Sequence, residues 1–173
     1  TFIVHPDAAK PEIRSAIDVL RYFGGVAQEL KGEVIPLGED LLVYNRREPL
    51  GVVGGIVPWN APVQLPALQI AMSITAGNTL VLKAAEDAPL GVLRLAAICA
   101  RHLPAGVLNV ITGHGHEAGA ALTDHPALRK LAFTCPTAVG PPAMPAAADL
   151  ILPRPPPLRG YVRPHCVPRP RRP

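Results

Sequence analysis

The sequence predicts an α/β fold built on a doubly wound, Rossmann-like parallel sheet, which is incomplete and is followed by a disordered Pro/Arg-rich tail. Three observations lead to this prediction. Strand-like and helix-like segments alternate with short connections over residues 50–134, which is the pattern of a parallel sheet with covering helices. Residues 50–57 are apolar at almost every position, as expected of a strand buried on both faces. After Gly140 the chain becomes rich in Pro and Arg, and proline blocks both helix and sheet.

The individual elements follow from hydrophobic periodicity. Apolar residues recur at steps of three and four over residues 11–31, which predicts an amphipathic helix with Pro11 in its first turn and Gly32 just beyond its end. Further along, the predicted strands are 41–47, 50–57, 79–83, 107–112 and 129–134, and the predicted helices are 63–76, 89–101 and 115–123. A turn at 58–62 ends the buried strand. Ligands of such folds bind at the carboxyl ends of the strands, so the candidate site lies in the residues that directly follow them.

Charge and proline divide the chain into two parts, a folded domain at 1–140 and a tail at 141–173. Residues 1–135 hold 11 Lys and Arg against 12 Asp and Glu, whereas residues 136–173 hold six Arg and one acid. Twelve of the 22 prolines lie in residues 136–173. The pI of about 9.3 therefore reflects the tail, which we expect to be disordered or polyproline-like. The protein as a whole is not interpreted as a binder of specific nucleic acids.

The composition excludes several other classes of protein and of site. Three cysteines form neither an even disulfide framework nor a metal-ligand spacing, which favours a reducing, cytoplasmic location. No apolar run reaches the ~18 residues of a membrane span, so no membrane partner is expected. The histidines are interpreted as exposed loop residues without a metal, because no carboxylate or cysteine stands at a useful spacing from them. They are His102, His114, His116 and His125.

Four segments at the predicted strand ends carry a resemblance to a known family. They are EPLGVVGGIVPWNAP (48–62), AGNTLVLKAAEDAPL (76–90), LPAGVLNVITGHGHEAG (103–119) and LAFTCPTAVG (131–140). In this order and spacing they resemble the aldehyde dehydrogenase superfamily. The resemblance identifies residues 1–140 as part of its NAD-binding domain, with the first strand of a bridging sheet at 41–48. It implies NAD-dependent oxidation of an aldehyde to a carboxylic acid.

Asn60 follows Pro-Trp, as the oxyanion-hole asparagine of this family does. Attack of a thiolate on an aldehyde generates an alkoxide, and a side-chain amide aimed at that oxygen stabilises it. The resemblance therefore implies a catalytic role for Asn60. From the residues alone, an asparagine that forms the turn after a strand is the alternative.

The resemblance also implies a set of cofactor-binding residues. Lys83 and Glu86 correspond to the pair that grips the adenosine ribose, and a carboxylate there accepts from the 2′-hydroxyl and favours NAD over NADP. The alternative is a solvated strand-end ion pair of little energetic value. The other expected residues in contact with or beside the cofactor are Ile56, Pro58, Trp59, Gly113, Gly115 and Thr134.

Two parts of the cofactor region depart from the usual patterns. The sequence GxGxxxG at 113–119 is not the common dinucleotide fingerprint, and we interpret it as wall and packing, or as a tight turn that needs positive φ. Cys135 and Pro136 stand where the family has Gly and Ser at its diphosphate-binding helix. Proline has no N–H and cysteine adds a Cβ, so both replacements are expected to weaken diphosphate binding.

The resemblance places the family's nucleophilic cysteine and general-base glutamate in downstream motifs that these 173 residues do not contain. The chain is therefore expected to be truncated and inactive alone, with Cys135 not serving as nucleophile and Cys99 belonging to the core. The family is homo-oligomeric, and its bridging sheet is completed by a strand of a partner subunit, so this fragment is not expected to assemble properly.

Two explanations of the tail remain open. A switch to Pro and Arg just before the base-bearing motif is consistent with a reading-frame slip. Alternatively, the tail is a genuine extension, and the chain is a non-catalytic remnant that binds nucleotide weakly or binds an acidic partner through its basic residues.

Overall fold

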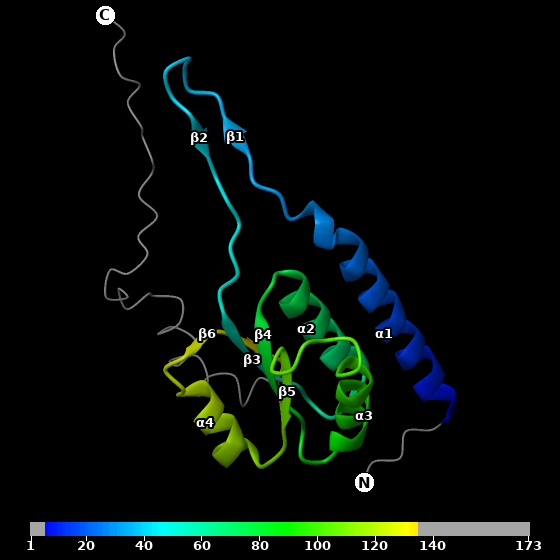
Figure 1. Ribbon diagram of the computed structural model, residues 1–173. Helices are drawn as coiled ribbons and strands as arrows, with labels where there is room; N and C mark the ends of the chain where they lie inside the picture. The colour runs from blue at the N-terminus through cyan, green and yellow to red at the C-terminus, as the bar shows by residue number, and fades with distance from the viewer. Residues whose placement is uncertain (1–5, 135–173) are drawn as a thin grey trace, which may run out of the picture.

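The strand that organises the fold is β3 (Val52–Ile56), which lies inside a four-stranded parallel sheet. The computed structural model describes residues 6–134. The strand order is β5-β4-β3-β6, where β4 is Thr79–Lys83, β5 is Leu108–Ile111 and β6 is Leu128–Phe133 (Figure 1). The chain builds the sheet outward from β3 through β4 to β5 and then returns to the other side of β3. The predicted doubly wound α/β fold is thereby confirmed.

Helices cover both faces of this sheet, and two adjacent glycines show which helix lies on which face. A Cβ on Gly55 would come within 2.3 Å of Gln69 Oε1 on helix α2 (Gln64–Thr75). A Cβ on Gly54 would instead meet Leu128 and, at 3.4 Å, the Cγ of Leu122 on the short helix α4 (Ala120–Thr123). Neighbouring residues of a strand point to opposite faces, so α2 and α4 lie on opposite sides of β3.

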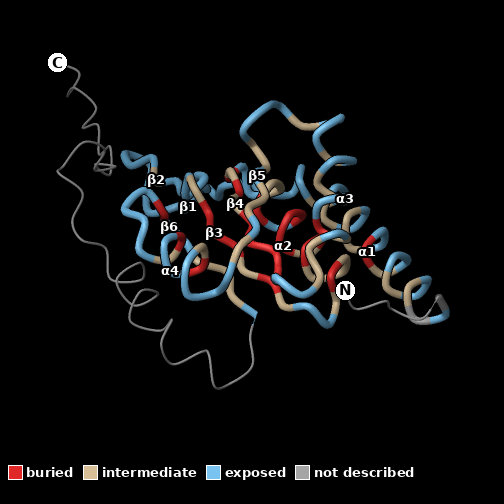
Figure 2. Tube along the Cα trace, turned by 90° about the horizontal axis from the view of Figure 1, so that it is seen from below, coloured by how far each residue is buried: buried red, intermediate tan, exposed pale blue. Residues whose placement is uncertain are grey.

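The core lies between the sheet and the helices that follow β3 and β4. Buried residues concentrate in β3, β4 and α2, as Figure 2 shows. Helix α3 (Pro89–Cys99) adds a single fully covered residue, Val92, to this cluster. The cluster consists of Val53, Val57, Ile70, Leu80, Leu82, Ala84 and Val92. The apolar run predicted for a doubly buried strand is thus explained by burial of β3 between two layers.

The first helix, α1 (Pro6–Val26), begins earlier than the sequence predicts. The expectation that Pro11 stands in its first turn is wrong, because Pro11 lies inside the helix. Pro6 provides the start instead, and a proline suits the first helical position since the N–H that it lacks has no helical partner there. A 3₁₀ turn at Ala27–Glu29 then ends the helical region, ahead of Gly32.

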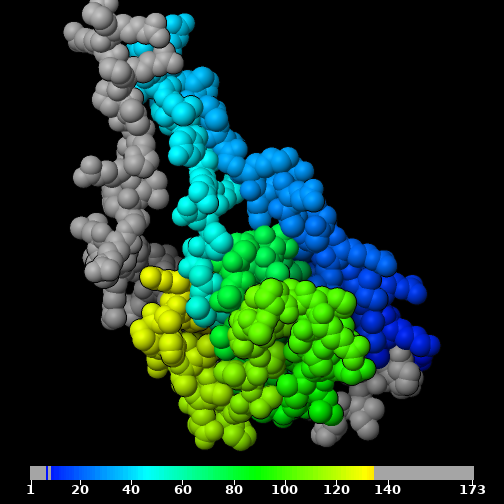
Figure 3. Space-filling view, in the orientation of Figure 1, coloured from blue at the N-terminus to red at the C-terminus, as the bar shows by residue number. Residues whose placement is uncertain are grey.

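The strand predicted at 41–47 is reduced to β2 (Val43–Tyr44), which pairs antiparallel with β1 (Val34–Ile35). The two strands form a narrow arm that stands away from the sheet, coloured light blue to cyan in Figure 3. Two strands of two residues share few backbone hydrogen bonds to stabilise them. Most of the apolar side chains of the arm are exposed. The exposed ones are Val34, Ile35, Leu37, Leu41, Leu42 and Tyr44.

The remaining predicted elements agree with the structure to within a few residues. The helix expected at 115–123 divides into a π-helical segment at Gly115–Gly119 and α4. The expectations for Cys135, Pro136 and the tail 141–173 lie outside the described residues. None of the helices in residues 6–134 is both long enough and apolar enough to cross a membrane.

Truncation of Leu82 tests how much of the stability resides in this core. Leu82 is fully buried, and Leu82→Ala is expected to lower the free energy of unfolding by about 2–5 kcal/mol through lost burial and a residual cavity. The matched control is Leu42→Ala on the arm, where the side chain is 67% exposed and an effect within about 0.5 kcal/mol is expected. Urea unfolding followed by circular dichroism measures both. Equal losses in the two variants would contradict this placement of the core.

Candidate functional site

The sheet register brings the predicted site residues to one edge. Ile56 is the register partner of both Lys83 and Phe133, and Lys83 is the partner of Ile111, so all four strands end at the same level. Backbone hydrogen bonds continue past these ends, for example from Thr134 N–H to the carbonyl of Ile56 at 3.3 Å. The carboxyl edge therefore collects the loops after β3, β4, β5 and β6, as expected for a ligand site in this fold.

Lys83 and Glu86 form an ion pair at the end of β4. Lys83 Nζ lies 2.5 Å from Glu86 Oε2, and the side chains are 4% and 40% exposed. The hydrogen bond and charge of Lys83 lower the pKa of Glu86 from 4.5 to about 2. A buried ammonium without a partner is strongly destabilising. Glu86 therefore offsets the free-energy cost of burying the charge of Lys83. The alternative of a solvated pair does not hold for Lys83.

Glu86 also connects β4 to the glycine-rich loop after β5. Its second oxygen, Oε1, accepts a hydrogen bond from the backbone N–H of Gly115 at 3.3 Å. Gly113 adopts φ +141°, and a Cβ there would come within 2.9 Å of Ala118 Cβ. The expected positive-φ turn is therefore present at Gly113, whereas Gly115 does not have positive φ. The carboxylate of Glu86 thus contacts both Lys83 and the backbone of the glycine-rich loop, and part of it remains exposed to solvent.

The loop between β3 and α2 carries three of the predicted residues. Pro58 is half-buried, Trp59 is 47% exposed and Asn60 is exposed. The loop begins where Val57 N–H donates to the carbonyl of Lys83 at 3.2 Å. Asn60 therefore lies just beyond the sheet edge, within the same group of loops as Glu86.

Two residues near this loop were not identified from the sequence. Glu12, on α1, accepts hydrogen bonds from the backbone of the loop's far end. Gln69, on α2, is 5% exposed and donates through Nε2 to the carbonyl of Ile56 at 3.3 Å. No local pattern marks either residue, because each acts on a segment that is distant in sequence and is brought near only by packing.

Cys99 and four histidines lie in the described part of the chain. Cys99 packs against the core, as predicted, and burial raises the pKa of its thiol. Within residues 6–134 no group of three or more His, Cys, Asp or Glu side chains is placed to hold a metal ion. The rings of His114 and His116 stack with centroids 5.6 Å apart, and both residues are exposed.

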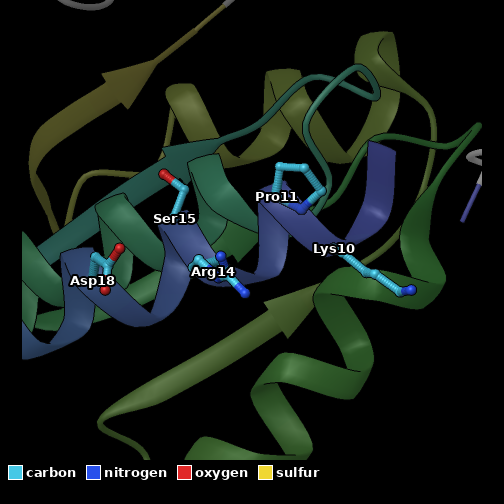
Figure 4. Close-up of a pocket in the computed structure, with 5 residues that line it drawn as sticks. All are labelled: Lys10, Pro11, Arg14, Ser15 and Asp18. Carbon is cyan, nitrogen blue, oxygen red and sulfur yellow. The ribbon is translucent and has the colours of Figure 1, made fainter. Parts of the chain in front are cut away.

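A separate hollow lies along α1, and Figure 4 shows the five side chains that line it. They are Lys10, Pro11, Arg14, Ser15 and Asp18. None of them comes from a loop at the carboxyl edge, and most are solvent-exposed. We therefore place the candidate site at the sheet edge and not in this hollow.

Comparison with known proteins points to one family. Residues 4–153 match the model of the aldehyde dehydrogenase family. An aldehyde dehydrogenase of Enchytraeus buchholzi is 51% identical over 123 residues, which cover 70% of this chain and 25% of the relative. A long-chain-aldehyde dehydrogenase of an Acinetobacter species is 43% identical over 142 residues, which cover 82% of this chain and 28% of the relative. The chain thus spans about a quarter of the length of these relatives.

A solved structure gives the same result at the level of the fold. The NAD⁺ complex of an aldehyde dehydrogenase from Bacillus cereus superimposes with a TM-score of 0.78 and 38% sequence identity. The match covers 81% of this chain and 29% of that protein.

The ion pair makes stability depend on pH in a defined direction. Because the folded state depresses the pKa of Glu86, its stabilising effect is complete above about pH 4.5 and is lost as the pH falls through about 2. Glu86→Gln should therefore destabilise the protein more at pH 7 than at pH 3, as measured by urea unfolding. Glu117→Gln is the control, since Glu117 is 68% exposed and its partner His116 is 78% exposed. A pH-independent difference between wild type and Glu86→Gln would contradict the assignment.

Proposed function

The chain belongs to the aldehyde dehydrogenase family, and on this premise we propose that it carries the NAD-binding portion of an enzyme that oxidises an aldehyde to a carboxylic acid. The observation that carries the proposal is the arrangement of Lys83, Glu86 and Gly115 at the carboxyl edge of the sheet. Ligands of doubly wound folds bind at this carboxyl edge of the sheet.

The residues at the edge fit NAD. Glu86 is 40% exposed, so its carboxylate can accept hydrogen bonds from the ribose hydroxyls, and the hydrogen bond from buried Lys83 lowers the pKa of Glu86. The same carboxylate would repel a 2′-phosphate, which favours NAD over NADP. Apolar surface for the cofactor rings is supplied by Ile56, Pro58 and Trp59. Thr134 lies exposed at the end of β6, beside the same edge.

In the proposed mechanism this chain binds the cofactor and stabilises charge. Glu86 and the loop around Gly113 and Gly115 would hold the adenosine end of NAD. The side-chain amide of Asn60 donates a hydrogen bond to the aldehyde oxygen as negative charge develops on it. NAD, when bound, supplies the hydride acceptor. The nucleophile and general base that the family resemblance implies are not among these 173 residues, so we propose that this chain alone binds nucleotide without turnover.

A second candidate function rests on the charge of the tail. Residues 136–173 hold six Arg and one acid, whereas the preceding part of the chain is almost neutral. The chain would then be a non-catalytic remnant whose tail binds an acidic partner. Salt-sensitive binding to a polyanion such as heparin, lost when residues 141–173 are removed, would favour this function over the first.

Nucleotide binding is tested by thermal unfolding with and without millimolar NAD. A ligand that binds only the native state raises the midpoint, by an amount equivalent to about 2.7 kcal/mol at 100 times its Kd. We expect a clear rise with NAD, a smaller one with NADP, and a loss of this difference in Glu86→Gln. Glu29→Gln, which alters a 68% exposed acid on the 3₁₀ turn after α1, is expected to respond as wild type does.

A folded chain whose midpoint does not change with NAD would overturn the proposed binding function. Incubation of the 173-residue chain with NAD and a panel of aldehydes is expected to form no NADH. Formation of NADH by this chain would overturn the proposal that it binds nucleotide without turnover.

A further inference from the structure

Glu12 makes an unusual connection between the first helix and the candidate site. Its Oε1 accepts hydrogen bonds from the backbone N–H groups of Val63, at 2.7 Å, and Gln64, at 3.1 Å. These donors form the start of α2, more than 50 residues away in sequence. Glu12 is half-buried, so the contact is partly shielded from water.

The start of α2 has no cap of its own. Helices leave their first N–H groups without helical partners, and a Ser, Thr, Asp or Asn before the helix commonly accepts from them. Here the capping position is Val63, whose side chain has no acceptor. The other early groups are satisfied locally, by bonds from Leu65 to Ala61 and from Ala67 to Val63, while Pro66 has no N–H. Glu12 therefore supplies the missing cap and places a negative charge at the positive end of the helix dipole.

A second hydrogen bond fixes how α1 lies along α2. Thr75 Oγ1, at the end of α2, donates to the carbonyl of Phe23 at 3.2 Å. Glu12 and Phe23 are separated by the same number of residues as Gln64 and Thr75, so the two helices run parallel and in register. They lie side by side in Figure 1. These two contacts oppose sliding of α1 along α2 and keep the carboxylate of Glu12 at the start of α2.

The cap that Glu12 provides also restrains the loop that contains Trp59 and Asn60. Its first end is held by the bond from Val57 N–H to the carbonyl of Lys83, and its last end by Glu12. Only residues 58–62 lie between these anchors. A short segment with two fixed ends has few conformations available, so the backbone of Asn60 is held in place before any ligand binds.

We propose that Glu12 is a positioning residue for Asn60: it caps α2 from a distance and thereby fixes the loop that presents the oxyanion donor. This role rests on the function proposed above for Asn60. If Glu12 had a purely structural role, its substitution would destabilise the whole domain, and the loop would not become more mobile than the core.

The test compares Glu12→Ala and Glu12→Gln with Asp18→Asn, which alters an exposed acid on the same helix. Two readouts report on the loop: amide hydrogen exchange at positions 63 and 64, and the emission and acrylamide quenching of Trp59, the single tryptophan of the chain. The amide of Leu82, in the core, reports on global unfolding. All are measured on the full chain without nucleotide, so a failure of NAD binding does not alter their interpretation.

Glu12→Ala is expected to speed exchange at Val63 and Gln64 by about ten- to hundredfold, the loss of hydrogen bonds to a charged group. The amide of Leu82 should change much less, and Trp59 should become more accessible to the quencher. Glu12→Gln keeps an oxygen acceptor and should show a partial effect in the same direction, whereas Asp18→Asn should match wild type.

Equal acceleration at all three amides with unchanged Trp59 signals would overturn the proposal in favour of a purely structural role. If Glu12→Ala does not fold, Glu12→Gln decides. Exchange at Val63 and Gln64 and Trp59 quenching identical to wild type in that variant would equally overturn it.

Discussion

The middle of strand β3 leaves no room for side chains on either face. Helix α2 approaches one face so closely that Gln69 lies over Gly55, and α4 with the start of β6 occupies the space beside Gly54. This close approach determines the architecture around the site, since α2 must begin almost directly above the end of β3. The loop between them is consequently short and turns sharply at the carboxyl edge, where the ends of all four strands meet.

Electrostatics then determines how the edge is held. A lysine at the end of a central strand is removed from water, and its charge is tolerated because Glu86 lies next to it. The same carboxylate accepts from Gly115 and so attaches the glycine loop to β4. The carboxylate remains charged well into the acid range and partly exposed, which is the state that a ribose-binding group requires. Structural support and the proposed binding role are therefore carried by one side chain.

Much of this organisation follows from local sequence. The strand at 79–83 was predicted with the bounds that the structure shows, because a short apolar run of β-branched and aliphatic residues has few alternatives inside a packed sheet. The positive φ of Gly113 follows from a tight strand-to-helix turn. The motif order placed Asn60 and Glu86 after successive strands, and in a parallel sheet such positions meet at one edge.

Other features were decided only by tertiary structure. The strand expected at 41–47 is short because its sole partner among the described residues is a two-residue strand on the arm, far from the sheet. Burial of Lys83 and capping of α2 by Glu12 depend on which elements the strand order brings together. The sequence by itself determined the fold class, the order of the strands along the chain and the residues at their ends. Tertiary structure decided which of those residues are buried, paired or held in place, because hydrogen bonds between distant segments leave no periodic signal in the sequence.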